Sequence, residues 1–112
     1  MRQAVVMGTG GHCRVVLSLL MAVKSHTINQ IIELGEPRSG ELIMGKLVTQ
    51  NCNNINEFCG RGDVDFFLAI GDVNIRKIWW ERLIELQFLM PNLISPHAII
   101  DETAELGKGN VV

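Results

Sequence analysis

Residues 4–16 read Ala-Val-Val-Met-Gly-Thr-Gly-Gly-His-Cys-Arg-Val-Val, and this stretch decides the fold. An apolar run, Ala4–Met7, breaks at Gly8, and a run with helical spacing begins beyond Gly11 and continues to about Val23. This order predicts a strand, a glycine turn and a helix. Glycines let a ligand approach the backbone, and the first amides of a helix attract anions. The turn therefore predicts a cradle for a phosphate or diphosphate.

The glycine turn departs from two known phosphate motifs. The dinucleotide fingerprint G-x-G-x-x-G would place a third glycine where this chain has Cys13, and the Gly-Lys-Ser or Gly-Lys-Thr of a P-loop is absent. A turn with a purely structural role therefore stays open as an alternative. Cys13 is predicted to be a small apolar side chain that fills a gap, with a helix-activated reactive thiol as the alternative.

The composition excludes several classes of function. A length of 112 residues suits one ordinary domain. Ten Lys and Arg against twelve Asp and Glu give a net charge of −2 without a block of like charge, which argues against nucleic acid or a membrane surface as partner. No apolar run approaches the roughly 18 residues of a membrane helix, and the N-terminus does not resemble a signal peptide. Three cysteines at spacings that match no zinc motif indicate reduced thiols in a cytoplasmic protein.

A second strand is predicted at Thr27–Leu34, where β-branched residues follow the helix. Together with the first strand and helix it indicates a parallel βαβ unit with a right-handed crossover. The polar residues before the strand end the helix, and His26 is predicted to be a solvated loop residue. The helix is expected to face the sheet with Val15, Val16, Leu19, Leu20 and Val23.

Glu33 is a candidate for binding ribose. It lies at the end of the second strand, roughly 20 residues beyond the glycine loop, where nucleotide-binding α/β units place a carboxylate for the ribose hydroxyls. A strand-end carboxylate that points to water is an equally good interpretation.

The middle of the chain predicts little regular structure. Gly35–Gly45 is expected to be a loop, Lys46–Thr49 a short strand, and a brief helix is expected to end at Phe58. The candidate caps of that helix are Asn53, Asn54 and Asn56.

A second junction of strand, glycine and helix follows. An apolar strand is predicted at Val64–Ile70, and Gly71 separates it from a helix at Ile75–Leu86, with Asp72 or Asn74 as the N-cap. Because ligands bind at the carboxyl ends of parallel strands, both junctions are expected to face one crevice. The inward stripe of this helix is predicted to contain Ile75, Ile78, Trp79, Leu83 and Leu86.

The last stretch has a period of six. Ile94, Ile100, Leu106 and Val112 are aliphatic, and small or polar residues stand two positions before each of them. This rhythm is typical of a hexapeptide-repeat parallel β-helix, and it predicts a domain boundary between residues 1–91 and 92–112. One coil cannot bury its own stacking face. The sequence therefore predicts a fragment or truncated product, or a tail that packs on something else.

Four motifs follow one another along the chain. They are Gly8-Thr-Gly-Gly-His12 with Val15 and Val16, Ile70-Gly71-Asp72-Val-Asn74 with Arg76, Pro91–Ala98, and Ala104–Gly109. In this order they resemble the bacterial sugar O- and N-acetyltransferases of the sialic acid O-acetyltransferase and UDP-4-amino-sugar N-acetyltransferase type. The resemblance spans nearly the whole chain, and the ordered set is more specific than any single motif.

This resemblance implies a small Rossmann-like α/β domain for a nucleotide sugar or a sialic-acid-type sugar, followed by a left-handed β-helix. The β-helix of the family trimerises and binds acetyl-CoA between subunits, so a homotrimer is expected for the full-length protein and a monomer or dimer for this chain. The family's catalytic histidine lies well inside the β-helix, so no catalytic residue is assigned here. The substrate-binding residues implied are Gly8, Thr9, Gly10, Gly11, His12, Glu33, Gly71, Asp72 and Asn74.

Two functions of other classes remain open at this point. One is a non-catalytic nucleotide-binding or NAD-binding Rossmann-type module, against which the missing third glycine and the hexapeptide rhythm both argue. The other is a structural trimerisation piece, which the shortness of the repeat region makes weaker. The leading expectation is the substrate-binding part of an acetyl-CoA-dependent sugar acetyltransferase, inactive by itself.

Overall fold

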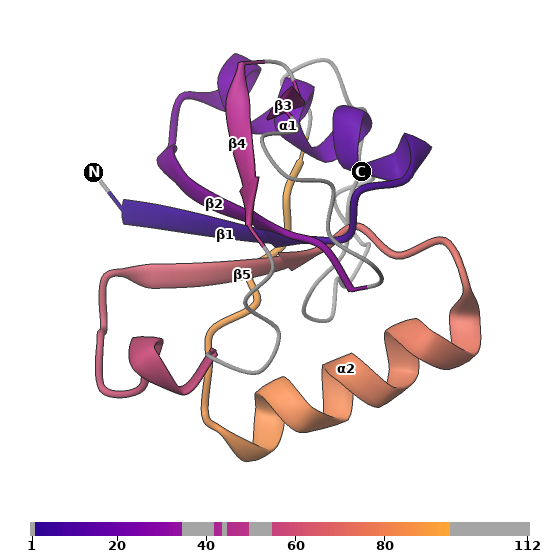
Figure 1. Cartoon of the computed structure of the whole chain (residues 1–112). Coiled ribbons are helices and arrows are strands. Elements are labelled where there is room, and N and C mark those ends of the chain that lie inside the picture. The colour runs from indigo at the N-terminus through magenta and orange to yellow at the C-terminus, as the bar shows by residue number, and fades with distance from the viewer. Residues whose placement is uncertain (1, 35–41, 44, 50–54, 95–112) are drawn as a thin grey trace, which may run out of the picture.

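The computed structural model describes residues 2–34, 42–43, 45–49 and 55–94, and it is an α/β structure (Figure 1). The order along the chain confirms the predicted strand, glycine turn, helix and parallel strand at the N-terminus, as well as the short strand after residue 45. The elements are β1 (Arg2–Met7), α1 (Gly11–Val23), β2 (His26–Ile32), β3 (Leu42–Ile43), β4 (Lys46–Thr49), the 3-10 helix η1 (Ile55–Phe58), β5 (Val64–Leu68) and α2 (Val73–Glu85).

The described strands form one sheet in the order β3-β4-β2-β1-β5. β1 pairs in parallel with both β2 and β5, and β2 pairs in parallel with β4. β3 pairs antiparallel with β4. The prediction of an irregular loop over Gly35–Gly45 is therefore wrong at Leu42–Ile43, because this dipeptide pairs with the next strand. The candidate caps of η1 at positions 53 and 54 lie outside the described residues.

The two helices lie on opposite faces of the sheet (Figure 1), and an apolar cluster lies between each helix and the sheet. Ala4 and Val6 of β1 join the cluster beneath α1, whereas Val5 and Met7 join the cluster beneath α2. This alternation follows from the two-residue period of a strand. All four side chains are fully buried, so β1, which lies between β2 and β5, is covered on both faces of the sheet where it leads into the glycine turn.

Helix α1 packs on the sheet through a stripe that is shifted from the predicted one. Cys13, Val16, Leu17 and Leu20 are buried, and Leu19 and Val23 are partly buried against the same cluster. Val15, expected to face inward, is 49% exposed. Cys13 and Leu17 thus belong to the buried face in place of Val15.

Helix α2 buries a narrower stripe than its sequence predicts. Leu83 is buried and Trp79 is partly buried, but Ile75 and Ile78 are exposed, so the inward role predicted for these two isoleucines is wrong. The helix lies on the face of the sheet opposite α1 (Figure 1), and a helix on the surface of a domain buries only one stripe of its circumference. Neither helix, nor any other in the described residues, is long and apolar enough to span a membrane.

The segment after α2 crosses the edge of the sheet. The Phe66 N–H donates a hydrogen bond to the Leu89 carbonyl at 2.8 Å, which places this segment beside β5. Met90 then packs in the cluster beneath α2, and Leu93 packs in the cluster beneath α1. The hexapeptide rhythm beyond Ile94 lies outside the described residues, and the predicted boundary at residues 91 and 92 stays a prediction.

Candidate functional site

A cavity of about 450 Å³ lies at the carboxyl ends of β1, β2 and β5. This is the edge at which parallel sheets bind ligands, because the loops that leave neighbouring strands separate there. The cavity combines the glycine turn, the end of β2 and the loop that leads to α2. It is lined by Gly8, Thr9, Gly10, Gly11, His12, Glu33, Leu34, Ala69, Ile70, Gly71 and Ile75.

Gly8 fixes the backbone at the start of the turn. Its φ of 113° is a conformation that side chains disfavour, and a Cβ built there would lie 2.9 Å from the Ala69 carbonyl carbon and still closer to the oxygen. The Gly8 N–H donates to the Ile32 carbonyl at 2.9 Å, and the Ala69 N–H donates to the Met7 carbonyl at 2.7 Å. These bonds join the ends of β1, β2 and β5 at the floor of the cavity.

The next two glycines face open space. A Cβ at Gly10 or at Gly11 would meet no atom within 4 Å. Gly10 is the N-cap of α1, and no side chain caps this helix. The start of α1 therefore presents backbone amides and the positive end of the helix dipole to the cavity, which is the arrangement that favours a bound anion.

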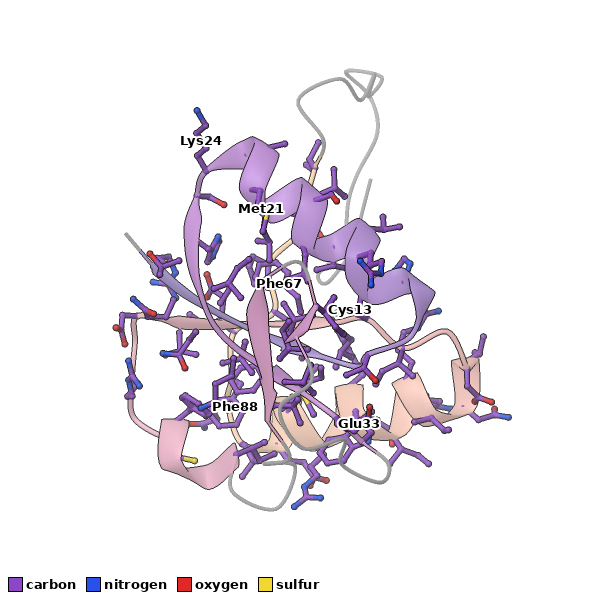
Figure 2. The ribbon with its side chains drawn as sticks, turned by 45° about the horizontal axis from the view of Figure 1, so that its top comes forward. Cys13, Met21, Lys24, Glu33, Phe67 and Phe88 are labelled. Carbon is purple, nitrogen blue, oxygen red and sulfur yellow. The ribbon has the colours of Figure 1, made fainter. Side chains whose placement is uncertain are left out.

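Glu33 contributes a carboxylate to the cavity wall at the end of β2 (Figure 2). The Thr9 hydroxyl donates a hydrogen bond to this carboxylate, and both residues are partly buried. Because Thr9 belongs to the glycine turn, the hydrogen bond holds the carboxylate beside this turn. A ribose hydroxyl that entered the cavity would find an acceptor there.

Most of the predicted site residues come together in this cavity. Gly8, Thr9, Gly10, Gly11, His12, Glu33 and Gly71 all line it, whereas Asp72 and Asn74 are not among the lining residues. The Asp72 carboxylate instead accepts from the Ile75 N–H at 3.0 Å, which confirms it as the N-cap of α2. Substrate contacts by these residues stay predictions.

The apolar wall of the cavity was not predicted. Leu34, Ala69, Ile70 and Ile75 line it, and Ile75 had been placed in the inward stripe of α2. Their position in the sequence could have indicated three of these four residues. Leu34 directly follows Glu33, and Ala69 and Ile70 directly precede Gly71, so all three lie at the ends of predicted strands.

Cys13 lies on the sheet-facing side of α1 and is fully buried (Figure 2). Burial raises the pKa of its thiol to about 11, and the nearby Arg14 opposes this only in part. A thiol with such a pKa is almost entirely protonated at neutral pH and is a poor nucleophile. The gap-filling role is therefore correct, and the reactive-thiol alternative is not supported.

We expect Cys13 to resist alkylation in the native protein. Iodoacetamide at pH 7.5 should modify the exposed Cys59 but leave Cys13 unmodified until denaturant is added, because both burial and the raised pKa suppress its thiolate. Peptide mapping by mass spectrometry measures each site separately. Modification of Cys13 at the rate of Cys59 in the native protein would contradict this expectation.

The family model of the PglD N-terminal domain matches residues 3–83. The chain belongs to this family. The structure of this chain is similar to that of a variant of perosamine N-acetyltransferase from Caulobacter crescentus in complex with CoA and GDP-perosamine. The TM-score is 0.85 at 27% identity, over 98% of this chain and 50% of that one. A search of curated proteins gave no match.

This chain is also similar to a second solved structure, the acetyltransferase domain of PglB from Neisseria gonorrhoeae in complex with acetyl coenzyme A. The TM-score is 0.79 at 27% identity, over 98% of this chain and 52% of that one. The chain thus spans about half the length of the solved structures that it matches. The resemblance to bacterial sugar acetyltransferases and the Rossmann-like α/β fold predicted from the sequence are both confirmed.

Proposed function

We propose that the cavity at the glycine turn binds the diphosphate and ribose of a nucleotide sugar, as the substrate-binding part of an acetyl-CoA-dependent sugar acetyltransferase. The observation that carries this proposal is the meeting of three groups at one edge of the sheet. These are the open glycines Gly10 and Gly11, the uncapped start of α1, and the Glu33 carboxylate held by Thr9.

Each group suits a different part of such a ligand. Amides at the start of α1 donate to phosphate oxygens, and Gly10 and Gly11 keep side chains away from them. Glu33 accepts from ribose hydroxyls, and the apolar side chains of Leu34 and Ile75 pack against the base or sugar. His12 lies beside the phosphates in this arrangement, Gly71 borders them, and Asp72 supports the cavity indirectly by capping α2.

The complete reaction is an acetyl transfer from acetyl-CoA to an amino or hydroxyl group of the sugar. It needs a base to accept the proton of the attacking group, and donors for the oxyanion that forms. We assign no catalytic residue among the described residues. The homotrimer and the cytoplasmic setting expected from the sequence belong to the same proposal.

Isothermal titration calorimetry of the chain against four ligands tests the proposal. The tightest ligand is expected to be either the UDP-linked or the GDP-linked 4-amino sugar. CMP-sialic acid and NAD are expected to bind more weakly. Saturable binding of NAD together with no response to any nucleotide sugar would instead support the NAD-binding module. If none of the four binds, the proposal is wrong.

Gly10→Ala is expected to separate ligand binding from stability. The new methyl group meets no protein atom within 4 Å, and the φ of −71° suits alanine, so the free energy of unfolding should change by less than about 1 kcal/mol. The same methyl group stands where the phosphates approach α1, and we expect about tenfold weaker binding of the nucleotide sugar.

Gly62→Ala is the matched control. Gly62 is also exposed, and a Cβ there also meets no atom within 4 Å, but this glycine lies outside the cavity. Calorimetry should find its affinity unchanged. Equal affinities for the Gly10→Ala and Gly62→Ala proteins would place the phosphates elsewhere.

A further inference from the structure

A second cavity, of about 820 Å³, lies at the opposite end of the sheet. It is bordered by the first residues of β1 and β2, the end of α1, the second half of α2 and the segment that follows α2. It shares no lining residue with the cavity at the glycine turn. The nucleotide-sugar proposal therefore assigns it no role.

One wall of this amino-end cavity holds a buried carboxylate with two partners. Asp65 is 2% exposed, and its two oxygens accept from Arg2 Nε at 2.7 Å and Arg2 Nη2 at 2.6 Å. His26 Nε2 lies 2.6 Å from Asp65 Oδ2, so the expectation that His26 is a solvated loop residue is wrong. Burial raises the pKa of the Asp65 carboxyl, but the hydrogen bonds from Arg2 and His26 outweigh burial and hold that pKa below its ordinary value.

This network fixes the Arg2 guanidinium at the cavity wall. An arginine side chain has five N–H donors in a planar fork, and Asp65 engages two of them. The Arg2 side chain nevertheless remains 41% exposed, and it lines the cavity. A guanidinium held in one orientation binds an anionic group with little loss of side-chain entropy.

Apolar side chains form the other walls of the cavity, and several of them are exposed to an extent that is unusual for large apolar residues. Trp80 and Ile84 of α2 line the cavity, and Ile84 is 50% exposed. Phe88, Leu89 and Ile94 line it from the segment after α2 (Figure 2 labels Phe88). A concave apolar surface of this kind beside an oriented polar group is typical of a binding site for a small molecule.

We propose that the amino-end cavity binds a small amphipathic anion. Its sulfonate, carboxylate or phosphate would pair with the exposed part of Arg2, and its flat or branched apolar body would lie against Trp80, Ile84 and Leu89. The charge of Arg2 is paired with Asp65, so the N–H groups of Arg2 that Asp65 does not engage and the apolar walls beside them select this class over a fully polar ligand. The inference is independent of the nucleotide-sugar proposal, because the two cavities lie at opposite ends of the strands.

The test is a fluorescence titration of the full chain with two dyes of one ring system. Anilinonaphthalenesulfonate carries a sulfonate and phenylnaphthylamine carries none, so their comparison isolates the contribution of the anionic group. We expect saturable binding of both dyes, with the sulfonate form about tenfold tighter. Equal affinities, or tighter binding of the uncharged dye, would overturn the role of Arg2.

Two glutamate substitutions on the same helix locate the dye. Ile84→Glu places a carboxylate on the cavity wall and should weaken binding of the sulfonate dye at least about tenfold. Ile78→Glu is the matched control, because Ile78 is 63% exposed on α2 and does not line the cavity. Near-ultraviolet circular dichroism should show that both variants are folded.

Two further outcomes would overturn the proposal. Equal loss of dye binding in both variants would mean that the dye binds α2 in general rather than the cavity. If a second copy of the chain covered the same surface, analytical sedimentation would find a dimer for the wild type and a monomer for the Ile84→Glu variant, and the proposal would be wrong. A monomer that loses dye binding only in the Ile84→Glu variant supports the proposal.

Discussion

Replacing Gly8 by alanine is expected to lower the free energy of unfolding by about 3–5 kcal/mol. Two effects add at this position. The φ of 113° is unfavourable for any residue with a Cβ, and the Cβ itself would overlap the backbone of Ala69. The overlapping atoms are a carbonyl group and not the end of a flexible side chain. Relief would therefore require β1 and β5 to separate, although the Ala69 N–H is bonded to the Met7 carbonyl.

Urea unfolding followed by circular dichroism measures this change, and the Gly10→Ala protein is its control. Both substitutions add one methyl group to the same turn, but only the methyl group at Gly8 meets protein atoms. The midpoint of the Gly8→Ala protein should fall far below that of the control. Similar midpoints for the two proteins would show that the turn relaxes easily and that Gly8 does not fix the strand ends.

Replacing Asp65 by asparagine is expected to cost about 2–3 kcal/mol of stability at pH 7. The substitution removes the charge that Arg2 and His26 surround, and it puts an amide N–H₂ group where one of them donates. His26 would also lose the partner that orients its ring against Phe67, whose centroid lies 5.2 Å away at a right angle. Asp63→Asn is the control, because the Asp63 carboxylate is 58% exposed and pairs with Arg61 at 3.4 Å.

The contribution of Asp65 should also depend on pH in a defined direction. Its pKa is lower in the folded protein than its ordinary value of 3.8, so the folded state favours the carboxylate. This stabilisation is fully present above about pH 4 and is lost as the pH falls through the lowered folded pKa. Urea unfolding at a series of pH values should therefore show the difference between wild type and Asp65→Asn shrinking below about pH 4. A constant difference down to pH 2 would contradict the assignment.

The first half of the fold could be predicted because its signals are local. Apolar runs broken by glycine and followed by helical spacing specify β1, α1 and β2 within a few residues. The inward face of α2 could not be predicted, because its apolar residues point in several directions and the sequence does not say which one meets the sheet. For this reason the sequence predicts Ile75 and Ile78 in the core, whereas both side chains are exposed in the structure.

The same distinction explains the two cavities. The site at the glycine turn could be predicted because parallel strands end at one edge, so each residue after a strand is a candidate. The network at the amino ends depends on Asp65 meeting Arg2 and His26, which are 63 and 39 positions away in the sequence. Without knowing that β1 lies between β2 and β5, a histidine beside lysine and serine resembles an ordinary loop residue.

The segment after α2 also protects the sheet from association through its edge. β5 is the last strand on its side of the described sheet, and an uncovered edge strand is a template for strands of other molecules. The Leu89 carbonyl occupies the Phe66 N–H, and Met90 and Leu93 anchor the covering segment on both faces. Residues 87–94 therefore shield this edge of the sheet from pairing with strands of other molecules.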